Sequence, residues 1–106
     1  MFARVSSYEF PPERADEVVR GFDEDDVLPS IPGVVEAYLL LDRAAGRALT
    51  MTVWETEEAL RSSEEAANRI RGRASGSADG RVRRVDRYEV ALRERFAGAG
   101  EQVGRP

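Results

Sequence analysis

Apolar and polar residues alternate along residues 2–9 (FARVSSYE), a stretch that contains aromatic and β-branched side chains. This pattern predicts a β-strand, which ends at a proline pair because proline cannot donate a hydrogen bond to a sheet. Pro12 suits the first turn of a helix. The apolar residues that follow recur at helical spacing, namely Ala15, Val18, Val19 and Phe22. We expect this helix to end near Val27 or Leu28, because two prolines follow closely.

Two further apolar runs, 34–41 (VVEAYLLL) and 48–55 (ALTMTVWE), flank a short polar segment that contains a glycine. Such a pair predicts a β-hairpin. Thr56 is a suitable N-cap for a second helix, whose first turn carries two glutamates. One face of this helix is narrow and consists mostly of small residues, namely Leu60, Ser63, Ala67, Ile70 and Ala74. Segment 75–80 (SGSADG) ends the helix, and 81–92 (RVRRVDRYEVAL) predicts the last strand.

The predicted order of elements is strand, helix, strand, strand, helix, strand. Two crossovers on one antiparallel sheet give an α+β, ferredoxin-like βαββαβ sandwich with both helices on one face. We therefore expect one domain over residues 1–92. The C-terminal tail, 93–106, is Gly-rich and polar, which predicts a flexible or loosely helical segment.

The predicted hairpin is apolar on both sides of the sheet. In its first strand one side carries Val34, Tyr38 and Leu40, and the other carries Val35, Ala37, Leu39 and Leu41. In its second strand the two sides carry Leu49, Met51 and Val53 and, opposite them, Thr50, Thr52 and Trp54. Only one face packs on the helices, so a monomer would expose apolar surface on the other. This predicts a homodimer formed through the sheet; the alternative is that scattered apolar surface residues need no partner.

The composition excludes several classes of function. The chain has 106 residues and a formal net charge of −4, whereas nucleic-acid and anionic-membrane binders are strongly basic. It has no Cys and no His, which removes thiolate chemistry and imidazole as a base, metal ligand or haem ligand. No apolar run approaches the roughly 20 residues that span a bilayer, and the N-terminus does not look like a signal peptide. We expect a soluble cytoplasmic protein with no nucleic-acid or membrane partner, no metal and no cofactor.

The turn Pro32-Gly33 leads into YLLLD, and the hairpin continues as GRALTMTVWETEEAL. Over residues 1–92 the chain resembles the antibiotic-biosynthesis-monooxygenase-like (ABM) family of dimeric α/β-barrel proteins, in which a strand ends in Trp and an acidic helix start follows. The resemblance implies a pocket between the sheet and the helices, with Trp54 at or near it. Some members oxidise aromatic polyketides with dioxygen, without metal or flavin, and take the electrons from the substrate. Members that degrade haem need a His on the second helix, which this chain lacks.

Trp54 is the first candidate site residue. Its indole suits stacking on a flat ligand with Nε1–H as a donor, and it equally suits a core or interface anchor. The oxidising members of the family also use a pocket Asn, and the one Asn of this chain is Asn68, far along the second helix. A polar rim is expected from polar positions on the strands, namely Ser6, Tyr8, Tyr38 and Thr52. For the tyrosines a structural place at a sheet-to-sheet interface is the alternative, and a phenol with a pKa of about 10 is a poor base at neutral pH.

Two charged clusters have a structural explanation. Consecutive carboxylates in 23–26 (DEDD) point about 100° apart on a helix, which favours a solvated face over a metal site. The arginines within 81–87 suit ion pairs with the acidic helices or with a partner subunit. Arg84 or Arg4 is the alternative contact, in a pocket, for an anionic ligand.

Two functions therefore stay open. The leading one is a small-molecule domain that, if catalytic, acts as a cofactor-independent monooxygenase on an aromatic or polyketide-type compound, mainly by positioning it. The alternative is a non-catalytic ligand-binding or stress-response dimer whose pocket is filled by its own side chains. A cavity of a few hundred Å³ beside Trp54 favours a ligand, and a fully packed site favours the alternative.

Overall fold

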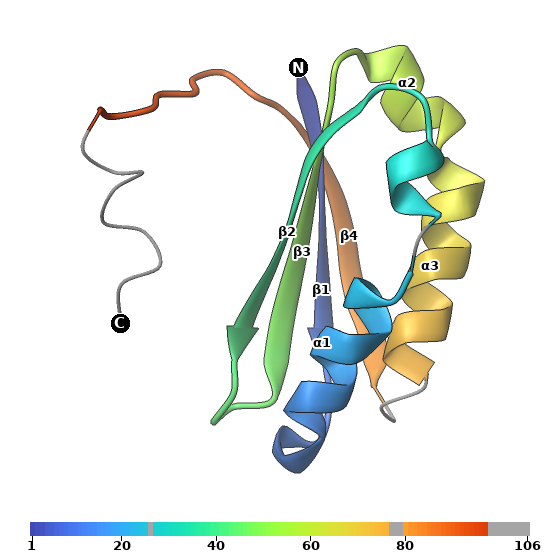
Figure 1. Ribbon diagram of the computed structural model, residues 1–106, viewed down its shortest axis with the longest axis vertical. Coiled ribbons are helices and arrows are strands. Elements are labelled where there is room, and N and C mark those ends of the chain that lie inside the picture. Colours follow the sequence, from blue (N-terminus) through green and yellow to red (C-terminus); the bar gives the residue numbers. More distant parts are fainter. Residues whose placement is uncertain (26, 77–79, 98–106) are drawn as a thin grey trace.

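The computed structural model describes residues 1–25, 27–76 and 80–97 and has an α+β fold (Figure 1). The strands are β1 (Phe2–Glu9), β2 (Val34–Asp42), β3 (Arg47–Trp54) and β4 (Arg81–Glu89). The helices are α1 (Ala15–Asp23), α2 (Glu57–Ser62) and α3 (Glu64–Gly76), with short 3-10 turns η1 (Pro12–Arg14) and η2 (Leu28–Ser30). This order confirms the predicted βαββαβ arrangement.

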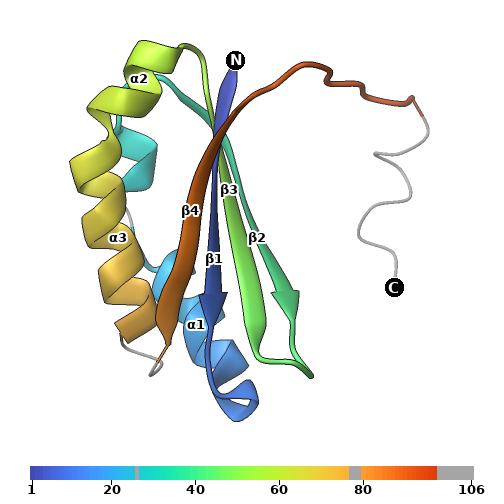
Figure 2. The ribbon, with the colours of Figure 1, turned by 180° about the vertical axis from the view of Figure 1, so that it is seen from behind.

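The strands form one antiparallel sheet in the order β2-β3-β1-β4. All the helices lie on one side of this sheet, which the front and back views both show (Figures 1 and 2). On its other side the sheet has no helix among the described residues. The chain after β4 leaves the sheet at the end where the N-terminus lies and extends away from the domain past β2 (Figure 1).

The first helix ends earlier than the sequence predicts. Helix α1 stops at Asp23, whereas we expected it to continue to Val27 or Leu28. The carboxylate Oδ1 of Asp25 accepts a hydrogen bond from the backbone N–H of Val27 at 2.9 Å. Such a local side-chain bond competes with the helical ladder and favours a turn at this point.

The second predicted helix is divided in two at Ser63. Thr56 is its N-cap as expected, since its hydroxyl accepts from the N–H of Ala59 at 3.0 Å. Seven residues after Thr56 the hydroxyl of Ser63, the C-cap of α2, donates to the carbonyl of Leu60 at 2.7 Å, and α2 ends at Ser62. Residues 77–79 of the predicted helix break lie outside the described residues.

The last strand is shorter than predicted. The N–H of Val90 donates to the carbonyl of Met1 at 2.9 Å, and the last paired residues of the two strands are Phe2 and Glu89. Strand β4 therefore ends at Glu89 and not at Leu92. Segment 90–97 continues without a helix or strand, and the rest of the predicted tail, from residue 98, lies outside the described residues.

The core lies where α1 packs on the end of the sheet, and it consists of Tyr8, Phe10, Ala15, Val18 and Ala48. The hairpin turn beside it needs a glycine. Gly46 has φ +68°, and a Cβ there would come within 2.2 Å of the carbonyl oxygen of Phe10. The chain can therefore close the β2–β3 turn against the core only with a residue that has no side chain.

The face of the sheet away from the helices exposes apolar side chains. Leu40 of β2 lies opposite Leu49 of β3, and these side chains are 52% and 41% exposed. Tyr38, opposite Met51, is 46% exposed. Helix-facing Leu39 and Leu41 pack against the core instead. The two-sided apolar character that the sequence predicts for this hairpin is therefore present in the structure.

Candidate functional site

A cavity of about 410 Å³ lies between the helix-facing side of the sheet and the layer formed by α1, η2 and α3. Its apolar lining residues are Val19, Phe22, Leu28, Pro29, Ala37, Leu39, Ala67 and Ile70. Its polar lining residues are Arg4, Ser6, Tyr8, Asp23, Asp25, Tyr38, Thr50, Thr52 and Arg71. A mostly apolar cavity of this size with a few polar groups is typical of small-molecule sites.

Strand β1 supplies the polar floor of the cavity. Side chains alternate across a strand, and the alternate residues Arg4, Ser6 and Tyr8 all point to the helix side and are buried. On neighbouring β3, Thr50 and Thr52 have the same orientation and pair with Ser6 and Arg4 in the register. Two adjacent strands thus present one continuous row of polar groups to the cavity.

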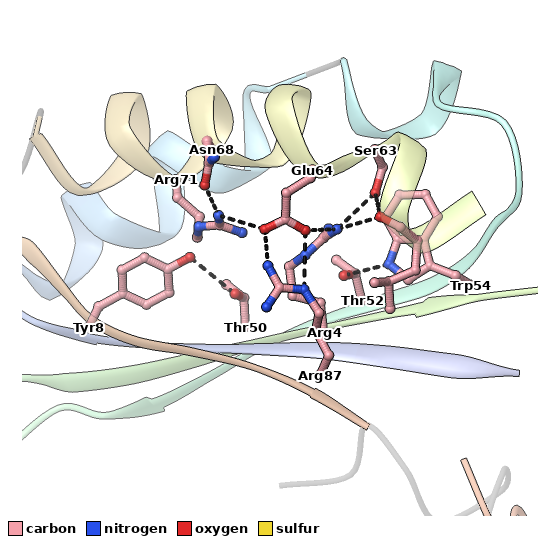
Figure 3. A network of polar contacts seen from close by, with 11 residues as sticks. Arg4, Tyr8, Thr50, Thr52, Trp54, Ser63, Glu64, Asn68, Arg71 and Arg87 are labelled. Carbon is pink, nitrogen blue, oxygen red and sulfur yellow. Dashed lines mark hydrogen bonds and ion pairs between the residues drawn. The ribbon is translucent and has the colours of Figure 1, made fainter. Parts of the chain in front are cut away.

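Arg4 is almost completely buried, with 1% of its surface exposed. Its Nη2 donates to the backbone carbonyl of Leu60 at 2.7 Å, to the hydroxyl of Ser63 at 3.0 Å and to the carboxylate of Glu64 at 2.9 Å (Figure 3). The Leu60 carbonyl belongs to the last turn of α2, where no helical donor follows. Arg4 therefore joins the sheet to the junction between α2 and α3.

Glu64, at the start of α3, is shared by three arginines. Its carboxylate accepts hydrogen bonds from Arg4 and from Arg87 of β4, and Arg71 of α3 lies 4.0 Å away (Figure 3). Burial alone would raise the pKa of Glu64, but the hydrogen bonds and charges of Arg87 and Arg4 outweigh it and lower that pKa. Glu64 is therefore ionised at neutral pH, and the guanidinium groups around it outnumber it.

Tyr8 places its hydroxyl near the middle of the cavity floor. The hydroxyl oxygen lies 3.1 Å from the Thr50 hydroxyl, and the ring packs edge-on against Phe22 at 5.4 Å between centroids. Burial raises the pKa of Tyr8, although hydrogen bonds with Thr50 and Ser6 oppose the change. The phenol is therefore neutral at physiological pH and acts as a hydrogen-bonding group, not as a base.

The indole of Trp54 lies next to the guanidinium of Arg4. It is completely buried, and its indole N–H donates to the Thr52 hydroxyl at 2.9 Å. The guanidinium carbon of Arg4 lies 5.5 Å from the centre of the indole ring, within cation–π range. Trp54 does not line the cavity, so its contact with the site runs through Arg4 and Thr52.

Five of the residues named from the sequence line the cavity, namely Arg4, Ser6, Tyr8, Tyr38 and Thr52, although the side chain of Tyr38 lies with that of Leu40 on the helix-free face. Tyr38 is at the β2 edge, and its hydroxyl donates to Glu36. Asn68 does not line the cavity, but its side-chain oxygen accepts from Arg71, which does (Figure 3). Arg84 pairs in register with Ser7 on the face away from the helices and forms an ion pair with Asp86 at 2.6 Å.

Sequence reasoning did not identify Arg71, Glu64 or Thr50 as site residues. Glu64 and Arg71 are seven positions apart, which places them on one face of a helix two turns from each other. That spacing was the available signal. Spacing alone does not distinguish these residues from the other charged residues of this helix.

Other kinds of site find no support in the described part of the chain. No group of three or more His, Cys, Asp or Glu residues there is placed to hold a metal ion. None of the described helices is long and apolar enough to cross a membrane.

Solved structures of similar fold include a haem degrader, a cofactor-independent oxygenase and a dimeric ferredoxin-like protein. The haem degrader MhuD from Mycobacterium tuberculosis, described with two haems bound in its active site, gives a TM-score of 0.68 at 20% identity, with 89% of this chain and 99% of MhuD covered. A mutant of SnoaB, a cofactor-independent oxygenase from Streptomyces nogalater, gives 0.61 at 14% identity, with 87% and 94% covered. A dimeric ferredoxin-like protein from an uncultured marine organism gives 0.67 at 9% identity, with 91% and 100% covered. At these identities the likeness concerns the fold alone.

Sequence comparison finds relatives with higher identity to this chain than these solved structures have. The chain is 36% identical over 98 residues to the uncharacterized protein Rv2558 of Mycobacterium tuberculosis strain H37Rv, which covers 90% of this chain. The chain spans only 41% of that relative's length. Residues 1–73 match the family model of the antibiotic biosynthesis monooxygenases. The chain therefore belongs to the antibiotic biosynthesis monooxygenase (ABM) family.

Proposed function

We propose that this domain binds a planar aromatic or polyketide-type molecule in the cavity and acts on it as a cofactor-independent monooxygenase. The observation that carries the proposal is the cavity of about 410 Å³, with apolar walls from the helices and a polar floor from β1 and β3. A flat apolar ligand with a few oxygen substituents matches such a site. Membership of the ABM family and the likeness to the oxygenase SnoaB support the same choice.

A monooxygenase without a cofactor takes its electrons from the substrate. In the simplest balanced reaction a ring CH₂ group loses two hydrogens and gains one oxygen atom from dioxygen, and the second oxygen atom leaves as water. The floor residues Ser6, Tyr8 and Thr50 offer hydroxyl groups to orient the ring oxygens. Because Tyr8 is neutral, the domain would contribute mainly by positioning the substrate and excluding water.

Haem is not the ligand that these residues fit. Haem iron is held by His, Cys, Met or Tyr side chains. The chain has no His and no Cys, and neither of its two Met residues lines the cavity. The hydroxyl of Tyr8 is already engaged with Thr50, and the hydroxyl of Tyr38 with Glu36. The likeness to MhuD therefore extends to the fold and not to its haem chemistry.

A non-catalytic ligand-binding dimer is the second candidate. One observation favours it. No described residue of the cavity floor is a base that accepts a proton near neutral pH, because Tyr8 is neutral and Ser6, Thr50 and Thr52 carry only hydroxyl groups. The open cavity argues for a bound ligand in either case and against a site filled by its own side chains.

The homodimer is part of the proposal. The exposed side chains of Tyr38, Leu40 and Leu49 form an apolar surface on the helix-free face of the sheet, which a second copy would cover. A neighbour of similar fold is described as a dimeric ferredoxin-like protein, which supports this assembly. The cytoplasmic location expected from the sequence stays a prediction.

The experiment is calorimetric titration with hydroxylated anthraquinones and anthrones, combined with dioxygen consumption on the anthrones. Binding together with consumption above the protein-free rate supports the oxygenase. Binding without consumption supports the non-catalytic candidate, and no binding across the panel contradicts both.

A variant that fills the cavity localises the effect. Ala67 of α3 is buried and lines the cavity, so Ala67→Phe should abolish binding. Ala66→Phe adds the same ring to the same helix at a residue that does not line the cavity and should leave binding intact.

A further inference from the structure

Arg4 has hydrogen-bond donors that the protein does not use. Its Nη2 makes three contacts, but its Nε and Nη1 are buried and have no hydrogen-bond partner among the described residues. Buried donors are almost always paired, because an unpaired one loses its bonds to water without replacement. Two such donors on one cationic side chain that lines a cavity indicate a missing acceptor.

The charges around the cavity floor also indicate a missing acceptor. Arg4 and Arg71 line the cavity, and both are buried. The carboxylate next to them, Glu64, also accepts from Arg87, so three guanidinium groups lie around this one carboxylate. A buried cation such as Arg4, whose donors are not all paired, favours an added anion.

The carboxylates on the other wall do not cancel this excess at the floor. Asp23 and Asp25 line the cavity from the segment between α1 and η2. Asp25 is already paired with Arg73 of α3 at 3.1 Å. Neither carboxylate forms an ion pair with Arg4 among the described contacts. The cavity therefore has a cationic floor on β1 and an acidic side wall.

We propose that the ligand of this cavity carries an anionic oxygen, either a carboxylate or an ionised ring hydroxyl, that binds at Arg4. This proposal deepens the proposed function and rests on it, since it assumes that the cavity holds an aromatic molecule. The anion accepts from Nε or from Nη1 of Arg4, two unpaired donors that point away from different edges of the planar guanidinium. Arg71 adds a second positive charge, and the aromatic body of the ligand lies against Phe22 and Ile70.

The test compares three probes on the unmodified protein by calorimetry near neutral pH: 3-hydroxy-2-naphthoic acid, its carboxamide and 2-naphthol. The acid should bind at least about tenfold more tightly than the amide, because only the acid carries the charge. If the ring hydroxyl is the anionic group instead, 2-naphthol should gain affinity as the pH rises through the pKa of its own hydroxyl.

The outcomes separate this proposal from the one on which it rests. Equal affinity for acid and amide, with 2-naphthol binding that does not change with pH, would overturn the anion and leave the aromatic site standing. No binding by any probe would overturn both. Tighter binding of the acid, or pH-dependent binding of 2-naphthol, supports the anion and identifies its source.

Variants place the effect at Arg4. Arg4→Gln should reduce the preference for the acid over the amide by about tenfold, and Arg4→Lys, which keeps the charge, should retain part of it. Arg84→Gln, the same change on the opposite face of the sheet, should leave the preference unchanged. Near-ultraviolet circular dichroism of Trp54, which Arg4 contacts, reports whether each variant is folded. A folded Arg4→Gln protein with an unchanged preference would contradict the proposal, and the three-probe comparison decides if that variant does not fold.

Discussion

The guanidinium of Arg4 donates to the carbonyl of Leu60, 56 positions further along the chain, at 2.7 Å. This bond joins the third residue of β1 to the last turn of α2. Glu64 and Ser63 accept from the same nitrogen, so one buried side chain fixes the point where the helical layer bends over the sheet. The same side chain lines the cavity, which couples the stability of the fold to the geometry of the site.

Arg4→Met should therefore destabilise the protein. The change leaves the Leu60 carbonyl and the Ser63 hydroxyl with one partner fewer and removes one of the cations around Glu64. Because Glu64 keeps Arg87 and is partly exposed, we expect a loss of about 2–3 kcal/mol in the free energy of unfolding, below the cost of a fully buried broken pair. Urea unfolding followed by Trp54 fluorescence measures it. Arg84→Met, on the exposed face, should change stability by less than about 0.5 kcal/mol, and a similar loss in both variants would refute this role of Arg4.

The lowered pKa of Glu64 predicts a loss of stability in acid. A carboxyl whose folded pKa lies below its ordinary value of 4.5 contributes stability that is present above that pH. The contribution is lost as the pH falls through the lower, folded pKa. Glu64→Gln should therefore be less stable than wild type near neutral pH, and the difference should shrink towards about pH 3. Glu65→Gln, on the exposed side of the same helix, is the control; a constant difference for Glu64→Gln would contradict the prediction.

The raised pKa of Tyr8 predicts a loss of stability in alkali. A phenol whose folded pKa lies above its ordinary value of 10.0 contributes stability that is fully present below pH 10.0. That contribution is lost as the pH rises towards the folded pKa. Tyr8→Phe should cost about 1 kcal/mol at neutral pH, through the lost Thr50 contact, and should unfold less steeply in alkali than wild type. Tyr88→Phe, on an exposed side chain, should follow the wild-type profile, and an equal alkaline slope in Tyr8→Phe would argue against the assignment.

Most of the fold was predictable because it follows from local patterns. The alternation in β1, the apolar hairpin and the Thr56 cap each determine an element without distant contacts. The element ends were less predictable, because they depend on single side-chain bonds such as Asp25 to Val27 and Ser63 to Leu60. Strand β4 ends at Glu89, where its pairing with Phe2 of β1 ends, and this end depends on the partner strand as well as on its own sequence.

The site was only partly predictable. Strand periodicity correctly grouped Ser6 and Tyr8, and by the same rule it also places Arg4 on the helix side. A charged side chain is buried only where other groups pair with it. The partners of Arg4 lie 56 to 60 positions away in α2 and α3, so the local sequence does not reveal them. The resemblance drew attention to Trp54, but the indole packs behind Arg4 rather than on the cavity wall. The guanidinium of Arg4, and not the indole of Trp54, is therefore the group that lines the cavity.

The apolar face of the sheet predicts a homodimer, and two negative charges introduced on this face should separate the two copies. Leu40 and Leu49 are opposite each other and exposed, so Leu40→Glu combined with Leu49→Glu should give a folded monomer. Sedimentation velocity at micromolar concentration should show wild type at twice the 11.8 kDa of one chain. Glu58→Arg, an exposed change on α2, should remain dimeric. A monomeric wild type would rule out the proposed assembly.

The most direct test of the ligand site is a map of where an aromatic molecule binds. Backbone amide spectra of the ¹⁵N-labelled protein, titrated with 3-hydroxy-2-naphthoic acid, report on both faces of the sheet at once. We predict shifts concentrated at Ser6, Tyr8, Thr50 and Ala67 around the cavity, together with the Nε–H signal of Arg4. Shifts confined to Leu40 and Leu49 on the other face, or no shifts at all, would contradict a binding site between the sheet and the helices.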